Sequence, residues 1–329
     1  MAPRLKAEAY IEGIRQGDRV MLARAITLVE SIRPDDQALA QAVLSALLPR
    51  TGQSLRIGLS GPPGVGKSTT MDALGMQLID AGHRVAVLAI DPSSQIGGGS
   101  ILGDKTRMPR LGASEHAFVR PSPAGSSLGG VAEKTREALL LCEASGYDVV
   151  IVETVGVGQS EIMVSQLGDT FVALMLPNAG DELQGIKKGI IEVADIIAIN
   201  KADGPMAAIA KRAKREHENA LHYSRQRIEG WSVPVVLMSA LEQTGLTGLW
   251  EAVKDHHRFM SAHGFFDQRR AEQRTQWMWH HIQTQLLAQF HSHPQVQSQL
   301  ERVEQQVRAG SLNPVAAAQS LLGFSLTQD

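Results

Sequence analysis

The residues of this sequence that most clearly indicate chemistry form a glycine-rich run beginning at position 61. Residues 61–68 read Gly-Pro-Pro-Gly-Val-Gly-Lys-Ser, which fits the phosphate-loop pattern G-x-x-x-x-G-K-S/T between a predicted strand and a predicted helix. The backbone N–H groups of such a loop surround phosphate oxygens, while its lysine reaches the β/γ-phosphates and its hydroxyl binds Mg²⁺. We therefore expect phosphate contacts from Gly61, Pro62, Pro63, Gly64, Val65, Gly66, Lys67, Ser68 and Thr69.

Three acidic residues are candidates for the magnesium ion that accompanies such phosphates. Asp91 and Glu153 each follow an apolar run that predicts a strand, and ligands of open parallel sheets bind beyond the carboxyl ends of the strands. Asp104 follows a glycine-rich stretch, and carboxylate oxygens are ligands that Mg²⁺ accepts. The alternative for each acid is helix capping or exposure to solvent. We expect catalytic roles for Lys67, Asp91, Asp104 and Glu153, and metal ligation by Ser68, Asp91, Asp104 and Glu153.

A second motif predicts that the base is guanine. Asn200-Lys201-Ala202-Asp203 follows the apolar run 196–199. The Asp203 carboxylate can accept from N1–H and from the exocyclic amine of guanine, whereas adenine would leave it unpaired at a cost of roughly 1.5–3 kcal/mol per charged hydrogen bond. Lys201 can lie over the face of the base. Ser239-Ala240-Leu241 follows the last predicted strand and is expected to provide a backbone amide for guanine O6.

Two further segments are expected to respond to the nucleotide. Gly156 stands three residues after Glu153, and its amide is a candidate sensor of the γ-phosphate. Residues 178–189 are rich in glycine and charge and follow another predicted strand. A connecting loop is the simpler interpretation of this segment, and a mobile nucleotide-sensing element is the more specific one. Its candidate regulatory residues are Asp181, Glu182, Gln184, Lys187 and Lys188.

The elements that position these motifs alternate along the middle of the chain. Short apolar runs separated by amphipathic stretches predict a doubly wound α/β domain with a mostly parallel sheet. The seven predicted strands are 56–60, 85–90, 117–119, 149–152, 171–176, 196–199 and 235–238. Helical periodicity predicts helices on both sides of this region, with Pro34, Pro294 and Pro314 at helix boundaries. We expect an N-terminal helical extension (1–50), a phosphate-loop GTPase domain (51–255) and a C-terminal helical dimerisation arm (256–329).

Composition argues against several other classes of protein. Lys plus Arg total 32 and Asp plus Glu total 34, for a formal charge of −2, and aromatic residues make up 4%. Neither value favours binding to nucleic acid or to an anionic membrane. With one cysteine, Cys142, no internal disulfide or multi-thiolate zinc site can form, and we expect this residue to be buried. The histidines of the C-terminal third, including His256 and His257, are expected at the surface. The N-terminus has neither a signal core nor a transit-peptide pattern, which predicts a cytoplasmic location.

The motifs together resemble one family. Beside residues 61–68, they are Asp91-Pro92-Ser93-Ser94, residues 99–108, residues 153–161 beginning Glu153-Thr154-Val155-Gly156, and residues 183–189. These resemble the MeaB/ArgK/MMAA GTPases, metallochaperones of adenosylcobalamin-dependent acyl-CoA mutases, in a class (SIMIBI) that includes signal-recognition and nickel-insertion proteins. Pro177-Asn178-Ala179 departs from the more glycine-rich stretch of such proteins.

The resemblance implies a homodimer that binds GTP or GDP with Mg²⁺ and meets adenosylcobalamin only through its partner. That partner is a methylmalonyl-CoA mutase or a related acyl-CoA mutase, whose cofactor loading the protein gates and which it protects from inactivation. Asp91, Asp104 and Glu153 match the magnesium-region acids of the family, and 178–188 matches the loop through which mutase and GTP site communicate.

The sequence also indicates how hydrolysis would proceed. We expect in-line attack of water on the γ-phosphate, catalysed mostly by positioning and charge neutralisation. Gln159 does not directly follow Gly156 and no arginine finger is evident, so hydrolysis should be slow until the partner activates it. Three alternatives remain open: a nickel or zinc carrier GTPase, a kinase linked to amino-acid transport, and a nucleotide-gated binding module whose hydrolysis is incidental.

Overall fold

The computed structural model describes residues 5–90, 107–120, 128–154, 160–178, 190–222 and 226–326. The chain forms two compact units, residues 1–270 and 271–329. The first unit contains a seven-stranded parallel sheet in the order β3-β2-β4-β1-β5-β6-β7. Its strands are β1 (Leu55–Ser60), β2 (Val85–Ile90), β3 (Ala117–Arg120), β4 (Val149–Thr154), β5 (Thr170–Met175), β6 (Ile196–Ile199) and β7 (Val235–Leu237).

All seven predicted strands are confirmed, and their residues explain why the sheet lies inside the unit. Every residue of β2, β5 and β6 is buried, as expected of parallel strands covered on both faces. Ends shift by a residue or two, and one shift matters. Because β4 continues through Thr154, Glu153 is its next-to-last residue and does not follow the strand.

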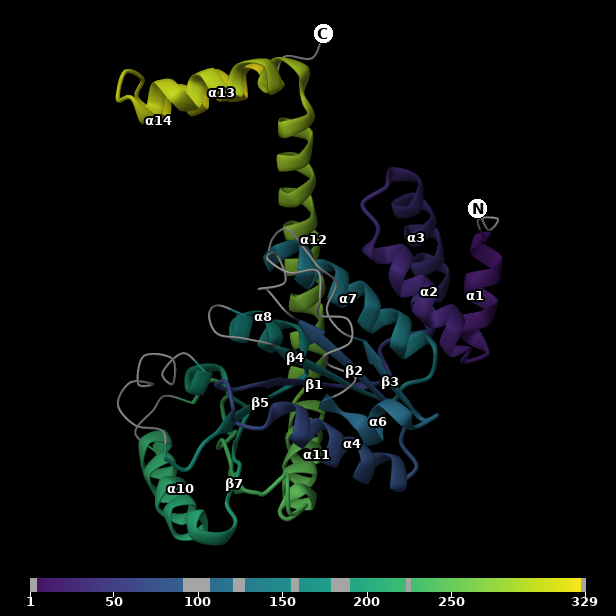
Figure 1. Ribbon diagram of the computed structural model, residues 1–329, viewed down its shortest axis with the longest axis vertical. Helices are drawn as coiled ribbons and strands as arrows, with labels where there is room; N and C mark the ends of the chain where they lie inside the picture. The colour runs from purple at the N-terminus through teal and green to yellow at the C-terminus, as the bar shows by residue number, and fades with distance from the viewer. Residues whose placement is uncertain are drawn as a thin grey trace. The chain divides into compact units, whose positions relative to one another are not determined.

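Helices cover both faces of the sheet (Figure 1). One face packs against α4 (Lys67–Asp80), α6 (Pro109–Ala113) and α11 (Leu246–Ala262). The other packs against α7 (Leu128–Ala144), α8 (Ser160–Leu167) and α10 (Ala207–His222). Short 3-10 turns occur at Leu48–Arg50 and Gly204–Met206. Neighbouring residues of a strand point to opposite faces, so each strand contributes to both cores.

The expected N-terminal helices are α1 (Ala7–Arg15), α2 (Arg19–Glu30) and α3 (Pro34–Leu47). The carboxylate of Asp18 caps α2 by accepting from the N–H groups of Val20 and Met21. Pro34 begins α3, where its missing N–H costs nothing. The three helices pack against one another, and α2 and α3 pack against α7, which joins the extension to the first unit.

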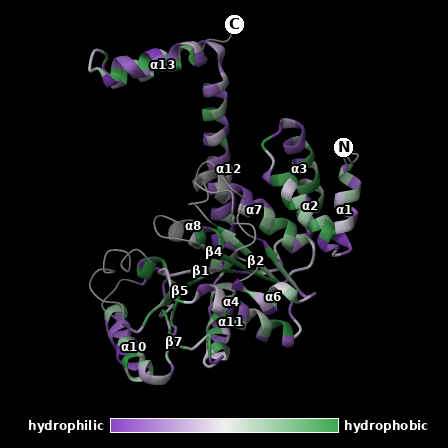
Figure 2. Cartoon of the chain, viewed as in Figure 1, coloured by the Kyte–Doolittle hydropathy of each residue, from purple (hydrophilic) through white to green (hydrophobic). Residues whose placement is uncertain are grey.

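The C-terminal helices are α12 (Phe265–Ser292), α13 (Pro294–Arg308) and α14 (Pro314–Leu326). Asn313 caps α14 by accepting from the N–H of Val315 at 2.9 Å, as the Asn-Pro pair predicts. Within the second unit, α13 and α14 share a small apolar cluster. Figure 2 shows hydrophobic colouring along the sheet and long hydrophilic stretches on α12 and α13.

The compact unit that contains the sheet extends to Arg270, and α11, which spans position 255, packs against the sheet. The expectation of surface histidines is wrong for His256, which is fully buried on α11. Cys142 is buried as predicted, and burial raises the pKa of its thiol. None of the described helices is both long and apolar enough to cross a membrane.

Candidate nucleotide site

The glycine-rich loop joins β1 to α4, and its glycines have identifiable structural roles. A Cβ on Gly61 would lie 2.4 Å from the carbonyl oxygen of Leu174 on the neighbouring strand β5, so no larger residue fits without a shift. Gly64 and Gly66 have φ values of 75° and 94°, in the left-handed region that side chains disfavour. The loop therefore turns sharply at positions where a larger side chain would be strained.

The helix that follows the loop adds positive charge at the same place. α4 begins at Lys67, and its N-terminus carries the positive end of the helix dipole. The Nζ of Lys67 donates to the carbonyl oxygen of Gly61 at 2.8 Å, which keeps the ammonium group over the loop. Ser68 is half-buried in the first turn. A cationic group, a hydroxyl and a helix N-terminus thus converge, an arrangement suited to phosphate.

Asn200 connects this loop to the segment predicted to bind the base. Its side-chain Nδ2 donates to the carbonyl oxygen of Val65 at 2.7 Å, and its Oδ1 accepts from the N–H of Ala240 at 2.9 Å. The residue is buried at the end of β6. A Cβ on Gly66 would lie 2.6 Å from Asn200 Nδ2, so the motif glycine also makes room for this contact.

The remaining residues of the two base-side segments lie beside Asn200. Lys201 has a φ of 60°, a left-handed conformation that is uncommon for a residue with a side chain, and its side chain is exposed. Asp203 is half-buried at the start of the 3-10 turn. Ser239 and Ala240 are buried, whereas Leu241 is 75% exposed. The backbone between Ser239 and Thr244 closes with hydrogen bonds of 2.9 and 3.0 Å.

Among the expected acidic ligands, the structure describes Glu153. It is 2% exposed and lies opposite Leu59 of β1 and Ala89 of β2 in the sheet. Since Gly61 follows β1 within two residues of Leu59, Glu153 lies at the same edge as the phosphate loop. The other expected site residues lie outside the described part of the chain: Asp91, Asp104, Gly156, Asp181, Glu182, Gln184, Lys187 and Lys188.

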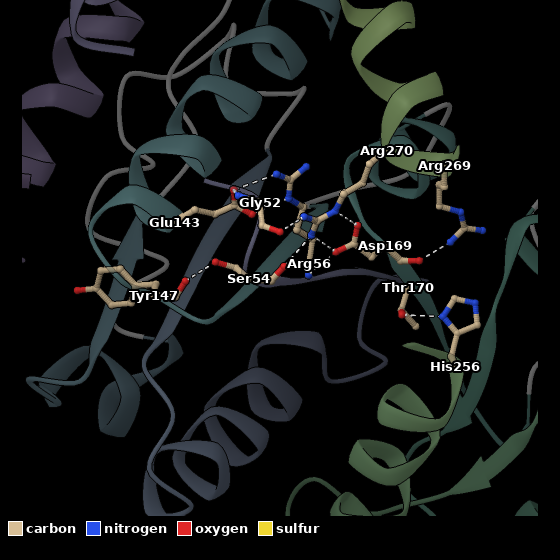
Figure 3. A network of polar contacts seen from close by, with 10 residues as sticks. All are labelled: Gly52, Ser54, Arg56, Glu143, Tyr147, Asp169, Thr170, His256, Arg269 and Arg270. Carbon is tan, nitrogen blue, oxygen red and sulfur yellow. Dashed lines mark hydrogen bonds and ion pairs between the residues drawn. The ribbon is translucent and has the colours of Figure 1, made fainter. Parts of the chain in front are cut away.

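Sequence reasoning missed a polar network at the opposite edge of the sheet (Figure 3). Arg270 donates to both carboxylate oxygens of Asp169, at 2.8 and 2.7 Å, and to the carbonyl oxygens of Ser54 and Gly52. Arg269 donates to the carbonyl oxygen of Asp169. The network therefore holds the residues that immediately precede β1 and β5, the strands whose other ends lead to residues 61 and 178.

Asp195, immediately before β6, belongs to the same edge. Burial alone would raise its pKa, but the nearby His256, Arg269 and Arg227 outweigh that effect and hold the pKa well below the ordinary value. Its Oδ2 accepts from Arg269 at 3.0 Å. His256 Nε2 lies 3.5 Å from Oδ1, at the long limit for a hydrogen bond. No sequence pattern indicates these partners, because each pair is far apart along the chain.

Another missed contact lies on α4. Asp72, one helical turn after Ser68, accepts from the Nε of Arg110 and from the backbone N–H of Leu111. The spacing of four residues from Ser68 could have suggested that both lie on one face of the helix. Nothing in the sequence identifies α6 as the partner.

Comparisons with known proteins agree with this architecture. A family model described as "Methylmalonyl Co-A mutase-associated GTPase MeaB" matches residues 22–295. GTPase ArgK of Escherichia coli is 45% identical, with 97% of this chain and 96% of that protein covered. The mouse protein named "Methylmalonic aciduria type A homolog, mitochondrial" is also 45% identical, over 94% of this chain and 77% of its own. A crystal structure of an "LAO/AO transport system kinase" is 38% identical, with a TM-score of 0.77 over 99% of this chain and 100% of the other.

Proposed function

This chain belongs to the MeaB family of methylmalonyl-CoA mutase-associated GTPases, and we propose that it uses its nucleotide state to control an acyl-CoA mutase. It is a GTPase of the phosphate-loop class and binds guanine nucleotides. In the proposed function it gates the loading of adenosylcobalamin into a mutase of the methylmalonyl-CoA mutase type and protects that enzyme from inactivation. The cytoplasm is the proposed location.

The observation that most supports the proposed nucleotide site is the pair of hydrogen bonds made by Asn200. One side chain links the carbonyl of Val65 in the phosphate loop to the amide of Ala240 on the base side. In the proposed site, residues 61–69 surround the phosphates while Asp203 accepts from the N1–H and the amine of guanine. Lys201 covers the base, and residues 239–241 face O6. The two hydrogen bonds of this one side chain would thereby fix the distance between the phosphate-binding loop and the base-binding residues.

We further propose that a magnesium ion is held beside the phosphates. The Ser68 hydroxyl and the Glu153 carboxylate provide oxygen atoms of the kind that Mg²⁺ prefers, and both lie at the carboxyl edge of the sheet. Asp91 and Asp104 are the further proposed ligands. Bound Mg²⁺ would neutralise charge on the β- and γ-phosphate oxygens.

The proposed reaction is an in-line displacement at the γ-phosphorus. A water oxygen forms the new bond to phosphorus, the bond to the β–γ bridging oxygen breaks, and GDP and inorganic phosphate leave. Lys67 and the N-terminus of α4 stabilise the negative charge that develops on the transferred group. We expect Gly156 to contact the γ-phosphate.

Regulation and assembly complete the proposal. Binding of the mutase would reorder residues 178–188 and so accelerate hydrolysis. A Lys188→Ala variant that the mutase still activates fully would refute this role for the loop.

We also propose a homodimer formed through the C-terminal helices. Met278, Trp279 and Leu286 of α12 are exposed apolar side chains, and an exposed apolar face on a helix is commonly covered by a partner.

The test is GTP hydrolysis by the purified protein with and without the cobalamin-dependent mutase of its host, with ATP as the control nucleotide. A large mutase-dependent rise with GTP, and none with ATP, would support the proposal. Slow GTP turnover that does not respond to the mutase would refute the partnership while leaving the GTPase. A variant that binds GTP without hydrolysing it distinguishes a gate that needs turnover from a binding module in which hydrolysis is incidental.

A further inference from the structure

A cavity of about 520 Å³ lies at the amino edge of the sheet. Three segments line it: residues between 191 and 194, which lead into β6, the last turns of α10, and residues between 226 and 233, which lead into β7. The proposed base-binding residues follow the opposite ends of the same two strands. The cavity is therefore separate from the nucleotide site, and its volume lies within the range of about 300–1,000 Å³ typical of small-molecule sites.

Trp231 forms a fixed wall of this cavity. Its Nε1 donates to the backbone carbonyl oxygen of Asp195 at 2.9 Å. The rings of His256 and Phe259 pack against the indole at centroid distances of 4.9 and 5.4 Å. The indole cannot turn without losing these contacts, so it is held in place before any ligand binds. An aromatic wall of this kind buries apolar groups well and attracts cations at its face.

Aliphatic side chains provide much of the remaining lining. Ile191, Leu221 and Val233 are half-buried residues that pack against the core cluster of the first unit and also line the cavity. Together with Trp231 they form an apolar surface against which the body of a ligand can lie. Sites for small molecules combine such surfaces with a few polar groups that fix the orientation of the ligand.

The charges of the lining favour a cation over an anion. Its ionisable residues are Glu192, Glu218, His222 and Arg227. Arg227 already donates to the buried carboxylate of Asp195, so its positive charge has a partner within the wall. Glu218 pairs with Lys214 of the same helix at 3.6 Å, a surface contact of the kind that contributes little. Glu192 is exposed beside the apolar lining, where its carboxylate can meet a positive charge.

We propose that this cavity binds a small organic cation, an ammonium or guanidinium group on an apolar body. The charged group lies beside Glu192, and the apolar body lies against Trp231. Because the volume is that of a small-molecule site, we assign a free amine or guanidine and not a basic side chain of a protein partner. The site is independent of the proposed mutase and of GTP hydrolysis.

The test uses the full-length protein saturated with GDP and Mg²⁺, so that the nucleotide site is occupied. Three probes of nearly equal size differ in charge: phenethylamine, phenethyl alcohol and phenylacetate. Their affinities are measured by ligand-observed NMR titration. We expect the amine to bind about fivefold more tightly than the alcohol, the factor that an exposed ion pair provides at the favourable end of its range. Phenylacetate should bind most weakly, because the lining carboxylates repel it.

Substitutions then place the site. Glu192→Gln keeps the shape of the side chain and removes its charge, so it should weaken phenethylamine binding by about the same factor and leave phenethyl alcohol unaffected. Glu229→Gln is the matched control, because Glu229 is an exposed carboxylate two residues before Trp231 that is not among the described lining residues. It should change neither affinity. Trp231→Phe should weaken both probes, since the smaller ring removes part of the wall. Glu192 is exposed, so its variant tests the site even if Trp231→Phe does not fold.

Several results would overturn the proposal. Equal affinities for the amine and the alcohol, tighter binding of phenylacetate, or no saturable binding of phenethylamine would exclude a cation site. A Glu192→Gln variant that binds phenethylamine as the wild type does would exclude this cavity as its location. A blocked peptide with adjacent Phe and Lys residues that binds at least as tightly as phenethylamine would exclude a free small molecule and indicate a protein partner.

Discussion

Removal of the Arg270 side chain is the perturbation whose effect the structure defines best. Arg270 is 5% exposed. It donates two hydrogen bonds to the carboxylate of Asp169 and others to the carbonyl oxygens of Ser54 and Gly52. Arg270→Ala would leave that carboxylate buried, with the backbone N–H of Arg56 still donating to it at 2.9 Å. Arg270 lies at the amino edge of the sheet, and the proposed nucleotide site lies at the carboxyl edge. The variant therefore tests stability and does not remove a nucleotide contact.

The magnitude follows from the geometry of the pair. Breaking a buried ion pair by removing one partner typically costs about 3–5 kcal/mol, because an uncompensated charge stays behind. The upper half of that range is appropriate here, because the variant loses the hydrogen bonds to the carbonyl oxygens of Gly52 and Ser54 as well as the bidentate ion pair with Asp169. Each kcal/mol lowers the melting temperature of a 150–250-residue domain by about 2–4 °C, so we expect a shift on the order of 10 °C.

The assay should report the first unit separately from the C-terminal helices. Cys142 is the single cysteine of the chain and is buried in the first unit. Its labelling by a thiol reagent in increasing urea, without nucleotide, follows the opening of that unit, and circular dichroism provides an independent measure. Arg258→Ala is the control, because Arg258 is 70% exposed and pairs with Asp255 one helical turn away, a contact worth about 0.3–0.5 kcal/mol.

Two results would show the reasoning to be wrong. The first is an Arg270→Ala protein within about 1 kcal/mol of the Arg258→Ala control, since a typical surface substitution already reaches about 0.5 kcal/mol. The second concerns the double variant Arg270→Met, Asp169→Leu. If the penalty of the single variant comes from an unpaired buried charge, replacing both partners by apolar residues should restore much of the stability. A double variant less stable than Arg270→Ala would contradict that cause.

Three further predictions concern other parts of the chain. Asn200→Ala should lower GDP affinity by at least about tenfold, since it removes both links between loop and base side, each worth about 1 kcal/mol; unchanged affinity in a nucleotide titration would contradict the proposed site. Because the pKa of Asp195 is lowered, its stabilising charge persists above the unfolded pKa of about 3.9 and is lost below it. The difference in unfolding free energy between wild type and Asp195→Asn should therefore be constant from pH 8 to 5 and about 1 kcal/mol smaller at pH 3; a difference that is unchanged at pH 3 would refute this assignment. Trp279→Glu with Leu286→Glu should yield monomers in sedimentation experiments if α12 forms the dimer contact, and an unaltered dimer would exclude that face.

The sequence predicted the parts of the fold that depend on local patterns. Mostly apolar runs of three to six residues, bounded by glycine or polar residues, identified every strand, because both faces of a parallel sheet are buried and such strands need no alternation. The glycine-rich pattern of residues 61–68 likewise predicted a loop between a strand and a helix, and the structure shows which atoms would collide with a larger residue at Gly61 or Gly66. Patterns of this kind are local, so single-sequence reasoning detects them.

Contacts between distant residues were not predictable in the same way. The Arg270–Asp169 pair joins positions 101 residues apart, and an arginine in a charged helix is usually solvated. His256 was expected at the surface for the same reason, since its neighbours in the sequence give no sign that Thr170 and Asp195 meet it inside the unit. These side chains meet because of the order of the strands in the sheet, and the periodicity of apolar residues along the sequence does not predict that order.

The two edges of the sheet differ in what they require of the sequence, which explains why the motif residues of the carboxyl edge were predicted and the polar network of the amino edge was missed. At the carboxyl edge the chain adopts left-handed backbone conformations at Gly64, Gly66 and Lys201. Around the proposed nucleotide, such conformations require particular residues in fixed succession, such as 61–68 and 200–203. At the amino edge the requirement is only that each buried charge has a partner, and Arg269 and Arg270 meet it from α12 with no consecutive motif. Because β1, β5 and β6 each connect one edge to the other, residues without any motif help to hold the strands from which the motifs project.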